Sequence, residues 1–565
     1  MVYNIMDLPK LSTTRNKIIT IVVDVIIPVH NAAATIQEAV ESALYQEWPD
    51  ESMSSNNNNH HSNSPVGSFR KEVSLSITVC CYDDGSSDNS LNILKQLQTD
   101  HSNKASQTAS GSDRTIPSRL LIKSSDNGTA RGAGYARNRA IEMNNPPLHH
   151  SRRNVETSSS VAADSNSTPA GDNNVKFLCL LDSDDIMHPN RVALQTHFMM
   201  TQLSSSETRH NTLLGCTFVR DPPDSTWHYS QWANSLTDER LLLERYREIT
   251  ILQPTWFMSY EVWTRVGGYV EAPSADSNDT VADILLRRQH EVPIDGNDVD
   301  DPRTSSCCLI HPRFDTPSSL RLAEDLRFFH AHLQCRGTTI RMLRTETPLV
   351  TYRYFGDSQS QSFRTSRKLL LQLRVLAVEQ SVLSRQWKDK RFIIWGAGRD
   401  GKDFYKALDP NFQRNVYCFV DVDLKKLNAG FHVTGRDKDT NNNDGETRKI
   451  PIVHFSFLIP DTKVRESAQT AWQRDGGAND ARNGCIDKTH PSKNDTPGEV
   501  RQPKKRQKRT TDLDRFQLVD RGLDRRLLQE LPVIVCVALY RTNGVLEKNV
   551  ASIERVEGEN LWHFS

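Results

Sequence analysis

The chain has 565 residues, and its 70 Lys and Arg are balanced by 70 Asp and Glu, so its formal net charge is zero. That balance excludes a generally basic protein that coats nucleic acid, although it permits a local basic patch. No segment approaches 18 uncharged apolar residues, which predicts no transmembrane helix and no membrane partner. The apolar stretch 18–27 carries Asp24 and lacks the pattern of a signal peptide, so we expect a cytoplasmic or nuclear protein.

The hydrophobic fraction of 36% is low for a globular chain, and the deficit is local. Polar stretches rich in Ser, Asn, Asp and Pro cannot bury enough apolar surface to fold, so we predict disordered inserts. They cover about 51–72, 100–118, 144–174, 270–318, 434–449 and 463–513. The last one holds a basic run, Arg501 to Arg509, which is either a nuclear address or phosphate-binding tether, or simply a solvated segment.

The N-terminal part alternates strand and helix patterns. Strands are predicted at 18–27, 74–82, 120–123 and 175–181, and helices at 31–44, about 90–97 and within 127–141. This order predicts an α/β fold with a doubly wound parallel sheet, in which ligands lie beyond the carboxyl ends of the strands.

A second α/β pattern follows, with strands predicted at 391–395, 416–420, 450–453 and 532–537. We therefore predict a first domain over 18–363, a connecting helix over 364–384 and a smaller Rossmann-like domain over 385–565.

The first acidic cluster, Asp182-Ser183-Asp184, directly follows a predicted strand. Hard cations such as Mg²⁺ are held by one or two carboxylates together with substrate phosphates. We expect Asp184 to bind a divalent cation, with Asp182 beside it or on a ribose. The alternative is a helix N-cap formed by Asp185.

Two further acidic clusters lie elsewhere along the chain. Asp83-Asp84 begins the segment that follows the second strand, where a carboxylate could accept a hydrogen bond from the imide N–H of uracil or simply cap a turn. Glu324-Asp325 begins a predicted helix. An Asp with its usual pKa of about 3.9 is ionised at pH 7 and can act as a general base, although an acid at a helix N-terminus also stabilises the helix dipole.

Taken together, these motifs resemble the family 2 glycosyltransferases of the GT-A fold. Six segments carry the resemblance in the family's order: 25–31, 83–88, 132–138, 182–185, 266–269 and 324–325. The resemblance implies a nucleotide-diphospho-sugar donor, a divalent metal (Mn²⁺ or Mg²⁺) and inversion at the anomeric carbon.

The same resemblance implies roles for individual residues. Asp325 is the catalytic base, and Asp184 holds the metal. The implied donor-binding residues are Pro28, Asn31, Asp84, Arg137 and Asp182, with Asp84 on the uracil; Trp256 and Glu324 are implied on the acceptor side. From the residues alone, Arg137 either reaches a donor phosphate or pairs on a helix surface, and Trp256 either stacks on a ligand or lies in the core.

A narrower resemblance is to the galactosyltransferases that act on the queuosine of tyrosine tRNA. It is carried by 220–226, 254–257, 324–329, 352–354, 420–423, 450–455 and 563–565, and it implies UDP-galactose as the donor and tRNA as the acceptor. One departure concerns the metal, because Phe355 stands where family 2 enzymes often have a histidine that assists it.

Three alternatives stay open. The first is a glycan transferase that uses UDP-N-acetylglucosamine. The second is an NAD(P)-dependent oxidoreductase, since Gly396, Gly398 and Gly401 with Asp421 or Asp423 form a dinucleotide fingerprint that could equally serve strand–helix packing. The third is a catalytically silent RNA-binding protein.

Overall fold

The computed structural model describes most of the predicted elements. The described residues are 18–50, 65–107, 114–126, 128–145, 174–203, 205–274, 276–291, 309–355, 365–434, 448–461, 521–538 and 544–565. Most of the predicted disordered inserts, including the basic run Arg501 to Arg509, lie outside these residues. The chain divides into two compact units, Met1–Val378 and Glu379–Ser565, and the division falls inside the predicted connecting segment.

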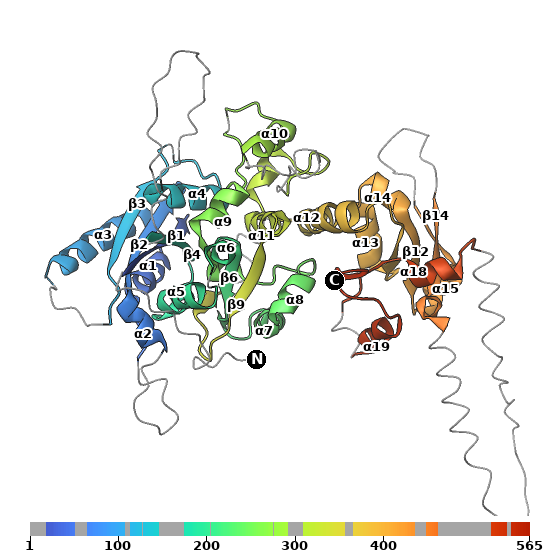
Figure 1. Cartoon of the computed structure of the whole chain (residues 1–565). Coiled ribbons are helices and arrows are strands. Elements are labelled where there is room, and N and C mark those ends of the chain that lie inside the picture. Colours follow the sequence, from blue (N-terminus) through green and yellow to red (C-terminus); the bar gives the residue numbers. More distant parts are fainter. Residues whose placement is uncertain are drawn as a thin grey trace, which may run out of the picture. The chain divides into compact units, whose positions relative to one another are not determined.

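A seven-stranded sheet flanked by helices forms the centre of the first unit (Figure 1). Its strands, in spatial order, are β3 (Ser118–Ser124), β2 (Val73–Asp83), β1 (Ile19–Val29), β4 (Asn174–Leu180), β8 (Phe257–Ser259), β6 (Thr212–Cys216) and β9 (Thr339–Leu343). The first four are parallel, as predicted, whereas β8 runs antiparallel to both of its neighbours and makes the sheet mixed. The predicted α/β class is confirmed, and the strand arrangement is consistent with a GT-A fold.

Strand β1 shows why the sheet forms here. Ile21, Val25 and Ile27 are completely buried, as expected for a parallel strand covered on both faces. Asp24 is also completely buried, and its carboxylate accepts hydrogen bonds from the side-chain amides of Asn144 and Asn145 at 2.7 and 2.8 Å. These bonds satisfy a charge that burial would otherwise penalise, and they fix the C-terminal end of α4 (Ala133–Asn144) to the sheet.

Helices surround this sheet. They are α1 (Ile36–Leu44), α2 (Pro65–Glu72), α3 (Ser90–Gln107), α4 (Ala133–Asn144), α5 (Arg191–Thr201), α6 (Ser206–His210), α7 (Trp227–Ser235), α8 (Asp238–Leu243), α9 (Tyr260–Val266), α10 (Val281–Glu291), α11 (Glu324–Gln334) and α12 (Arg367–Val378). A second, three-stranded sheet has the order β5 (Ile186–Met187), β10 (Val350–Arg353) and β7 (Phe218–Asp221).

Three helices correct the prediction of disordered inserts. All of α2, the end of α3 and all of α10 fall in stretches whose composition predicts no structure. In α10, Val281 and Ile284 lie on one face and form a small core with Val270, Ile310 and Leu320. Polar neighbours conceal this short apolar stripe when composition is averaged over the whole stretch.

The second unit contains a six-stranded sheet. Its order is β13 (Phe431–Val433), β14 (Lys449–His454), β12 (Val416–Asp421), β11 (Phe392–Trp395), β15 (Val533–Val535) and β16 (Leu561–His563). Only β13 is antiparallel. The four predicted strands are present, while β13 and β16 were not predicted. The helices are α13 (Arg399–Ala407), α14 (Pro410–Asn415), α15 (Leu424–Ala429), α18 (Arg525–Glu530) and α19 (Val545–Ser552), after a π-helical segment at Glu379–Gln386.

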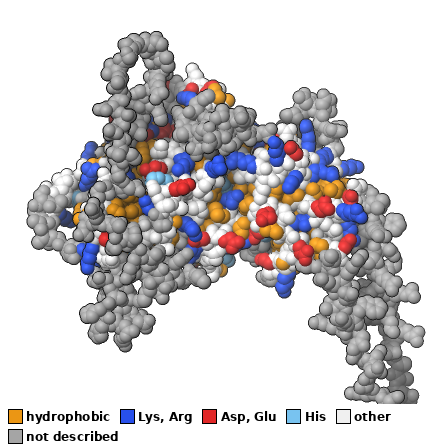
Figure 2. Space-filling view, in the orientation of Figure 1, with side chains coloured by type: hydrophobic (Ala, Val, Ile, Leu, Met, Phe, Trp, Pro, Cys, Tyr) orange, Lys and Arg blue, Asp and Glu red, His pale blue; other side chains and the backbone are white. Residues whose placement is uncertain are grey.

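The surface agrees with the neutral composition. On the face drawn in Figure 2, Lys and Arg side chains lie among Asp and Glu side chains. Within the described ranges, no helix combines the length and the apolar character needed to cross a membrane.

A buried ion pair anchors the segment that precedes α11. Arg327 and Asp315 are 1% and 0% exposed at their side chains, and Nη2 of Arg327 lies 2.5 Å from Oδ1 of Asp315. The same guanidinium donates to the carbonyl of Leu322, and the carboxylate accepts from the N–H of His311. Removing one partner would leave the other charge buried and uncompensated.

We therefore expect Asp315→Ala to destabilise the first unit by about 3–5 kcal/mol, measured as a shift of its calorimetric unfolding transition in the full chain. Replacing both partners, in Asp315→Leu with Arg327→Met, should recover most of that loss. The control is Asp279→Ala, which breaks an exposed pair with Arg287 and should leave the unfolding transition nearly unchanged. Equal losses for Asp315→Ala and Asp279→Ala would contradict the anchoring role.

Candidate active site

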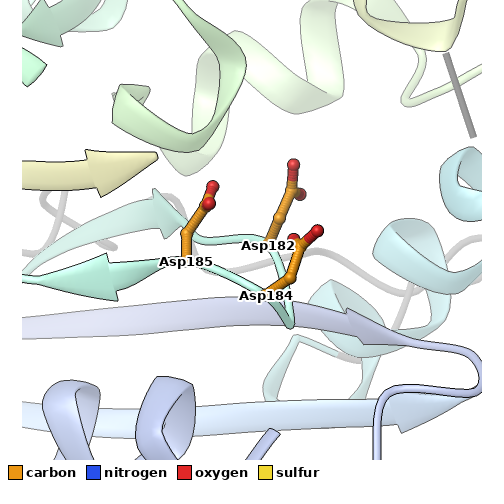
Figure 3. Close-up of side chains that lie close together, drawn as sticks. All are labelled: Asp182, Asp184 and Asp185. Atoms are coloured by element: carbon orange, nitrogen blue, oxygen red, sulfur yellow. The ribbon is translucent and has the colours of Figure 1, made fainter. Parts of the chain in front are cut away.

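The strand β4 delivers an acidic cluster to the edge of the sheet. Asp182, Asp184 and Asp185 occupy the loop between β4 and β5, and one oxygen of each carboxylate lies within 4.8 Å of the others. Figure 3 shows the three side chains extending to the same side of that loop. Helix α5 begins at Arg191 with Asn190 as its N-cap residue, so Asp185 is not a helix cap.

The cluster carries more negative charge than its surroundings compensate. Burial and the neighbouring Asp182 raise the pKa of Asp184 to about 6. Asp185 is 0% exposed, and burial together with Asp184 raises its pKa well above the ordinary range. Its Oδ1 accepts from the N–H of Arg353 at 3.0 Å, but its buried Oδ2 has no hydrogen-bond partner among the described residues. Oxygen ligands with an unsatisfied buried carboxylate oxygen suit a hard divalent cation.

Arg353 is a site residue to which the sequence assigns no role. It closes β10, its N–H donates to Asp185, and its side chain donates to the carbonyl oxygen of Asp184 and to Glu38 on α1. The only sequence signal is its position in the Tyr352-Arg-Tyr354 motif. Its guanidinium brings positive charge to the acidic loop.

A second group of predicted donor residues lies at the ends of β1 and β2. Asp84 is 2% exposed, and its Oδ2 accepts from the N–H groups of Arg131 and Gly132 at 2.8 and 2.7 Å, just before α4. Burial raises the pKa of Asp84, and these two bonds oppose the shift. The buried Oδ1 has no hydrogen-bond partner in the described part of the chain, so one carboxylate oxygen is left for a ligand.

Asn31 and Pro28 contribute to this edge differently. Asn31 is exposed, has a left-handed φ of 51°, and accepts at Oδ1 from the N–H of Ser87 at 2.8 Å. Pro28 is buried within β1, and the next residue, Val29, accepts at its carbonyl from the N–H of Asp84 at 2.8 Å. The bonds of Val29 and Asn31 hold the ends of β1 and β2 together, and Pro28 lies buried one residue before Val29.

Arg137 connects the acidic loop with the third cluster. Its side chain is 3% exposed and lies 2.5 Å from Asp182 and 2.8 Å from Glu324. Burial disfavours its charge, but the two carboxylates raise the pKa of Arg137, so it stays cationic. Arg137 is therefore an internal bridge and not a pair on a helix surface. The close approach of α4 to α11 favours glycine at 134, since a Cβ there would lie 3.2 Å from Cβ of Glu324, closer than most Cβ contacts.

Asp325 occupies the first turn of α11, next to the bridged Glu324. It is partly exposed, and its Oδ1 accepts from the N–H of Leu326 at 2.7 Å. Burial and the charge of Glu324 raise the pKa of Asp325 to about 7, while the Leu326 bond and the Arg137 charge oppose the rise. A carboxylate with that pKa exchanges protons near neutral pH, which suits a general base.

The structure places Trp256 in the core and not at an acceptor. It is 0% exposed, its indole N–H donates to the carbonyl of Ile251 at 2.8 Å, and its ring packs against Phe328 and Phe329. Its indole N–H is already bonded and its ring is covered by α11, so Trp256 is a core residue. It supports α11, the helix that carries Asp325.

Phe355, at the position where family 2 enzymes often have a histidine, is 42% exposed. An aromatic ring supplies no metal ligand, so the cation would be held by carboxylates and by the substrate.

No family model matches the chain. Among solved structures, the chain is similar to Staphylococcus aureus TarS residues 1–349 in complex with UDP, with 13% identity over 70% of this chain and 83% of that one and a TM-score of 0.32. The same fragment with UDP-GlcNAc gives 12% identity, 70% and 84% coverage, and a TM-score of 0.32. The longer TarS structure gives 14% identity, 70% and 50% coverage, and a TM-score of 0.33. A likeness this distant carries no argument about activity.

Proposed function

We propose that this chain is a metal-dependent, inverting glycosyltransferase that uses a UDP-sugar. One observation supports the proposal above all: the Arg137 bridge holds the acidic loop at Asp182 against Glu324, and therefore beside Asp325. Cation ligands and a base with a pKa near neutrality are thus gathered at one end of the parallel strands. Ligands of α/β folds bind at such ends.

The proposed reaction is a single displacement. The acceptor hydroxyl attacks the anomeric carbon, its proton passes to the carboxylate of Asp325, and the bond to UDP breaks with its electron pair staying on the diphosphate. Asp184, with Asp182 and Asp185 nearby, would hold the divalent cation. When bound, that cation supplies a positive charge that stabilises the leaving diphosphate. One displacement inverts the anomeric configuration.

The donor base is proposed to lie against Asp84, whose unpartnered Oδ1 can accept from the uracil imide N–H. Asn31 supports this edge through its bond to Ser87, and Pro28 is proposed to support it from its buried place in β1. Arg137 acts on the donor indirectly, because both of its ion pairs are to protein carboxylates.

We further propose galactose as the transferred sugar and the queuosine of tyrosine tRNA as its acceptor, making the chain a queuosine-tRNA galactosyltransferase. The support is the set of sequence segments that resemble such enzymes, among them 220–226 and 324–329. Those segments include the start of α11, where the proposed base lies.

For the base, Asp325→Asn should lower kcat by about 10²–10⁴-fold, because the amide cannot take the acceptor proton, while UDP-sugar binding stays within about twofold. Transfer is measured with radiolabelled donor, and donor binding is measured by calorimetry. Asp283→Asn, on the exposed side of α10, is the matched control and should leave both unchanged. Full turnover of Asp325→Asn would remove Asp325 from the mechanism.

The rate should depend on pH through the same carboxyl group. Below about pH 7 Asp325 is protonated and cannot act as a base, so kcat/KM should fall about tenfold for each pH unit below that value and level off above it. Saturating metal keeps Asp184 ionised, which assigns the acid limb to Asp325. A profile that stays flat from about pH 5.5 to 8 would contradict a base with this raised pKa.

For the donor and acceptor, nucleosides of tyrosine tRNA from cells lacking this protein should contain queuosine but no galactosyl-queuosine by mass spectrometry. Re-expression of the wild-type chain should restore the modified nucleoside, and Asp325→Asn should not. Persistent galactosyl-queuosine would exclude the acceptor. Transfer from UDP-N-acetylglucosamine but not from UDP-galactose, measured with the purified chain, would exclude the sugar.

A further inference from the structure

The second unit contains a cavity of about 450 Å³ that the proposed sugar transfer does not use. It lies beyond the carboxyl ends of β11, β12 and β15, and it is lined by the glycine-rich turn, by the segment that follows β12 and by the start of α19. Its volume falls within the range for small-molecule sites, and the ends of parallel strands are where α/β folds bind ligands.

One side of the cavity holds two basic side chains, Arg399 and Lys426. They lie beside the carboxylates of Asp400 and Asp421, which also line the cavity. Arg399 begins α13 and is 76% exposed at its side chain. Nζ of Lys426 stands 3.4 Å from the point where a Cβ on Gly398 would lie, so this ammonium group lies over the glycine turn. Gly398, the N-cap residue of α13, has no side chain to cap the helix. This side can therefore receive an anionic group such as a phosphate.

Two of the residues that line the cavity are apolar and exposed to solvent. Val422 and Val545 both line it, and they are 50% and 57% exposed. They belong to different segments, the loop after β12 and the first turn of α19. A flat apolar group that lies between these two valines would cover their apolar surface. Removing that surface from water favours binding.

Internal bonds restrict what else the cavity can recognise. The fingerprint acid, Asp421, accepts at Oδ2 from the N–H of Ala397 and from Lys426 at 2.7 and 2.9 Å, and at Oδ1 from the N–H of Asp423 at 2.9 Å. It is therefore occupied by the protein. Asp423 has a side chain that is 45% exposed and is the carboxylate that can accept from ribose hydroxyls.

The spacing of the three glycines is not evidence that a ligand binds here. A Cβ at Gly401 would lie 1.9 Å from the carbonyl oxygen of Gly396, so packing alone requires glycine there.

We infer that this cavity binds a nucleotide. Its phosphate lies at the start of α13 between Arg399 and Lys426, its base lies between Val422 and Val545, and its ribose faces Asp423. The inference does not depend on the proposed glycosyl transfer, because every residue that carries it lies in the second unit. It includes no redox step.

The test is calorimetric titration of the full chain with AMP, ADP, NADH and UDP, each to about 1 mM. We expect saturable binding of at least one adenine nucleotide. Val545→Glu, which places a negative charge at the base position, and Arg399→Glu, which reverses the charge at the phosphate position, should each weaken it at least tenfold. Both side chains are exposed, so neither change removes core packing. Binding of AMP shows a mononucleotide site, whereas binding of NADH alone shows a dinucleotide site, and either supports the inference.

The matched control is Val556→Glu, an equally exposed valine of the second unit that does not line the cavity, and its affinity should stay within twofold of wild type. Binding of none of the adenine nucleotides would overturn the inference, as would binding that Val545→Glu and Arg399→Glu leave unchanged. If UDP binding is lost in Asp84→Asn but kept in Val545→Glu, the UDP site lies in the first unit. Asp325→Asn should abolish glycosyl transfer without changing the affinity for adenine nucleotides. The two proposals can therefore be rejected independently.

Discussion

The geometry of the candidate site depends on one buried cation. Arg137 is held by Asp182 on one side and Glu324 on the other, and these residues are separated by more than 140 positions in the sequence. Each carboxylate alone would repel the rest of the acidic cluster. The shared guanidinium makes their close approach favourable, since breaking one such pair leaves a buried charge uncompensated. The bridge therefore sets the spacing between the acidic loop and the first turn of α11.

The Arg137 bridge leaves the carboxylates of Asp184 and Asp325 without full charge compensation. Arg137 is shared between Asp182 and Glu324, so it only partly offsets the burial and repulsion that raise the pKa of Asp184 and Asp325. A cation would relieve the first of these two groups, and a proton from an acceptor would relieve the second. In the proposed reaction, a bound cation and the acceptor proton would offset part of the free-energy cost of assembling the cluster.

The sequence predicted the parallel strands and the three acidic motifs because local patterns encode both. Buried strands are continuously apolar, and clustered acids at their ends stand out against that background. It failed where the signal is nonlocal. Antiparallel β8 is only three residues long, α10 is hidden in a polar stretch, and the role of Arg353 depends on β10 pairing with β5. Trp256 was ambiguous because a tryptophan in a short motif suits a core as well as a ligand, and only its packing against α11 decides.

The two units use the same device, carboxylates at the ends of parallel strands, with different results. In the first unit Asp84 and Asp185 each keep a buried oxygen without a hydrogen-bond partner among the described residues, so their capacity for a ligand remains. In the second unit both carboxylate oxygens of Asp421 accept hydrogen bonds from neighbouring N–H groups and Lys426, so Asp421 stabilises the turn. A motif written in sequence letters cannot separate these cases, because both place an acid after a strand. What separates them is whether the fold itself satisfies the acid. We therefore propose that the cavity of the second unit recognises its ligand through Arg399, Lys426 and the exposed valines that line it, and not through Asp421.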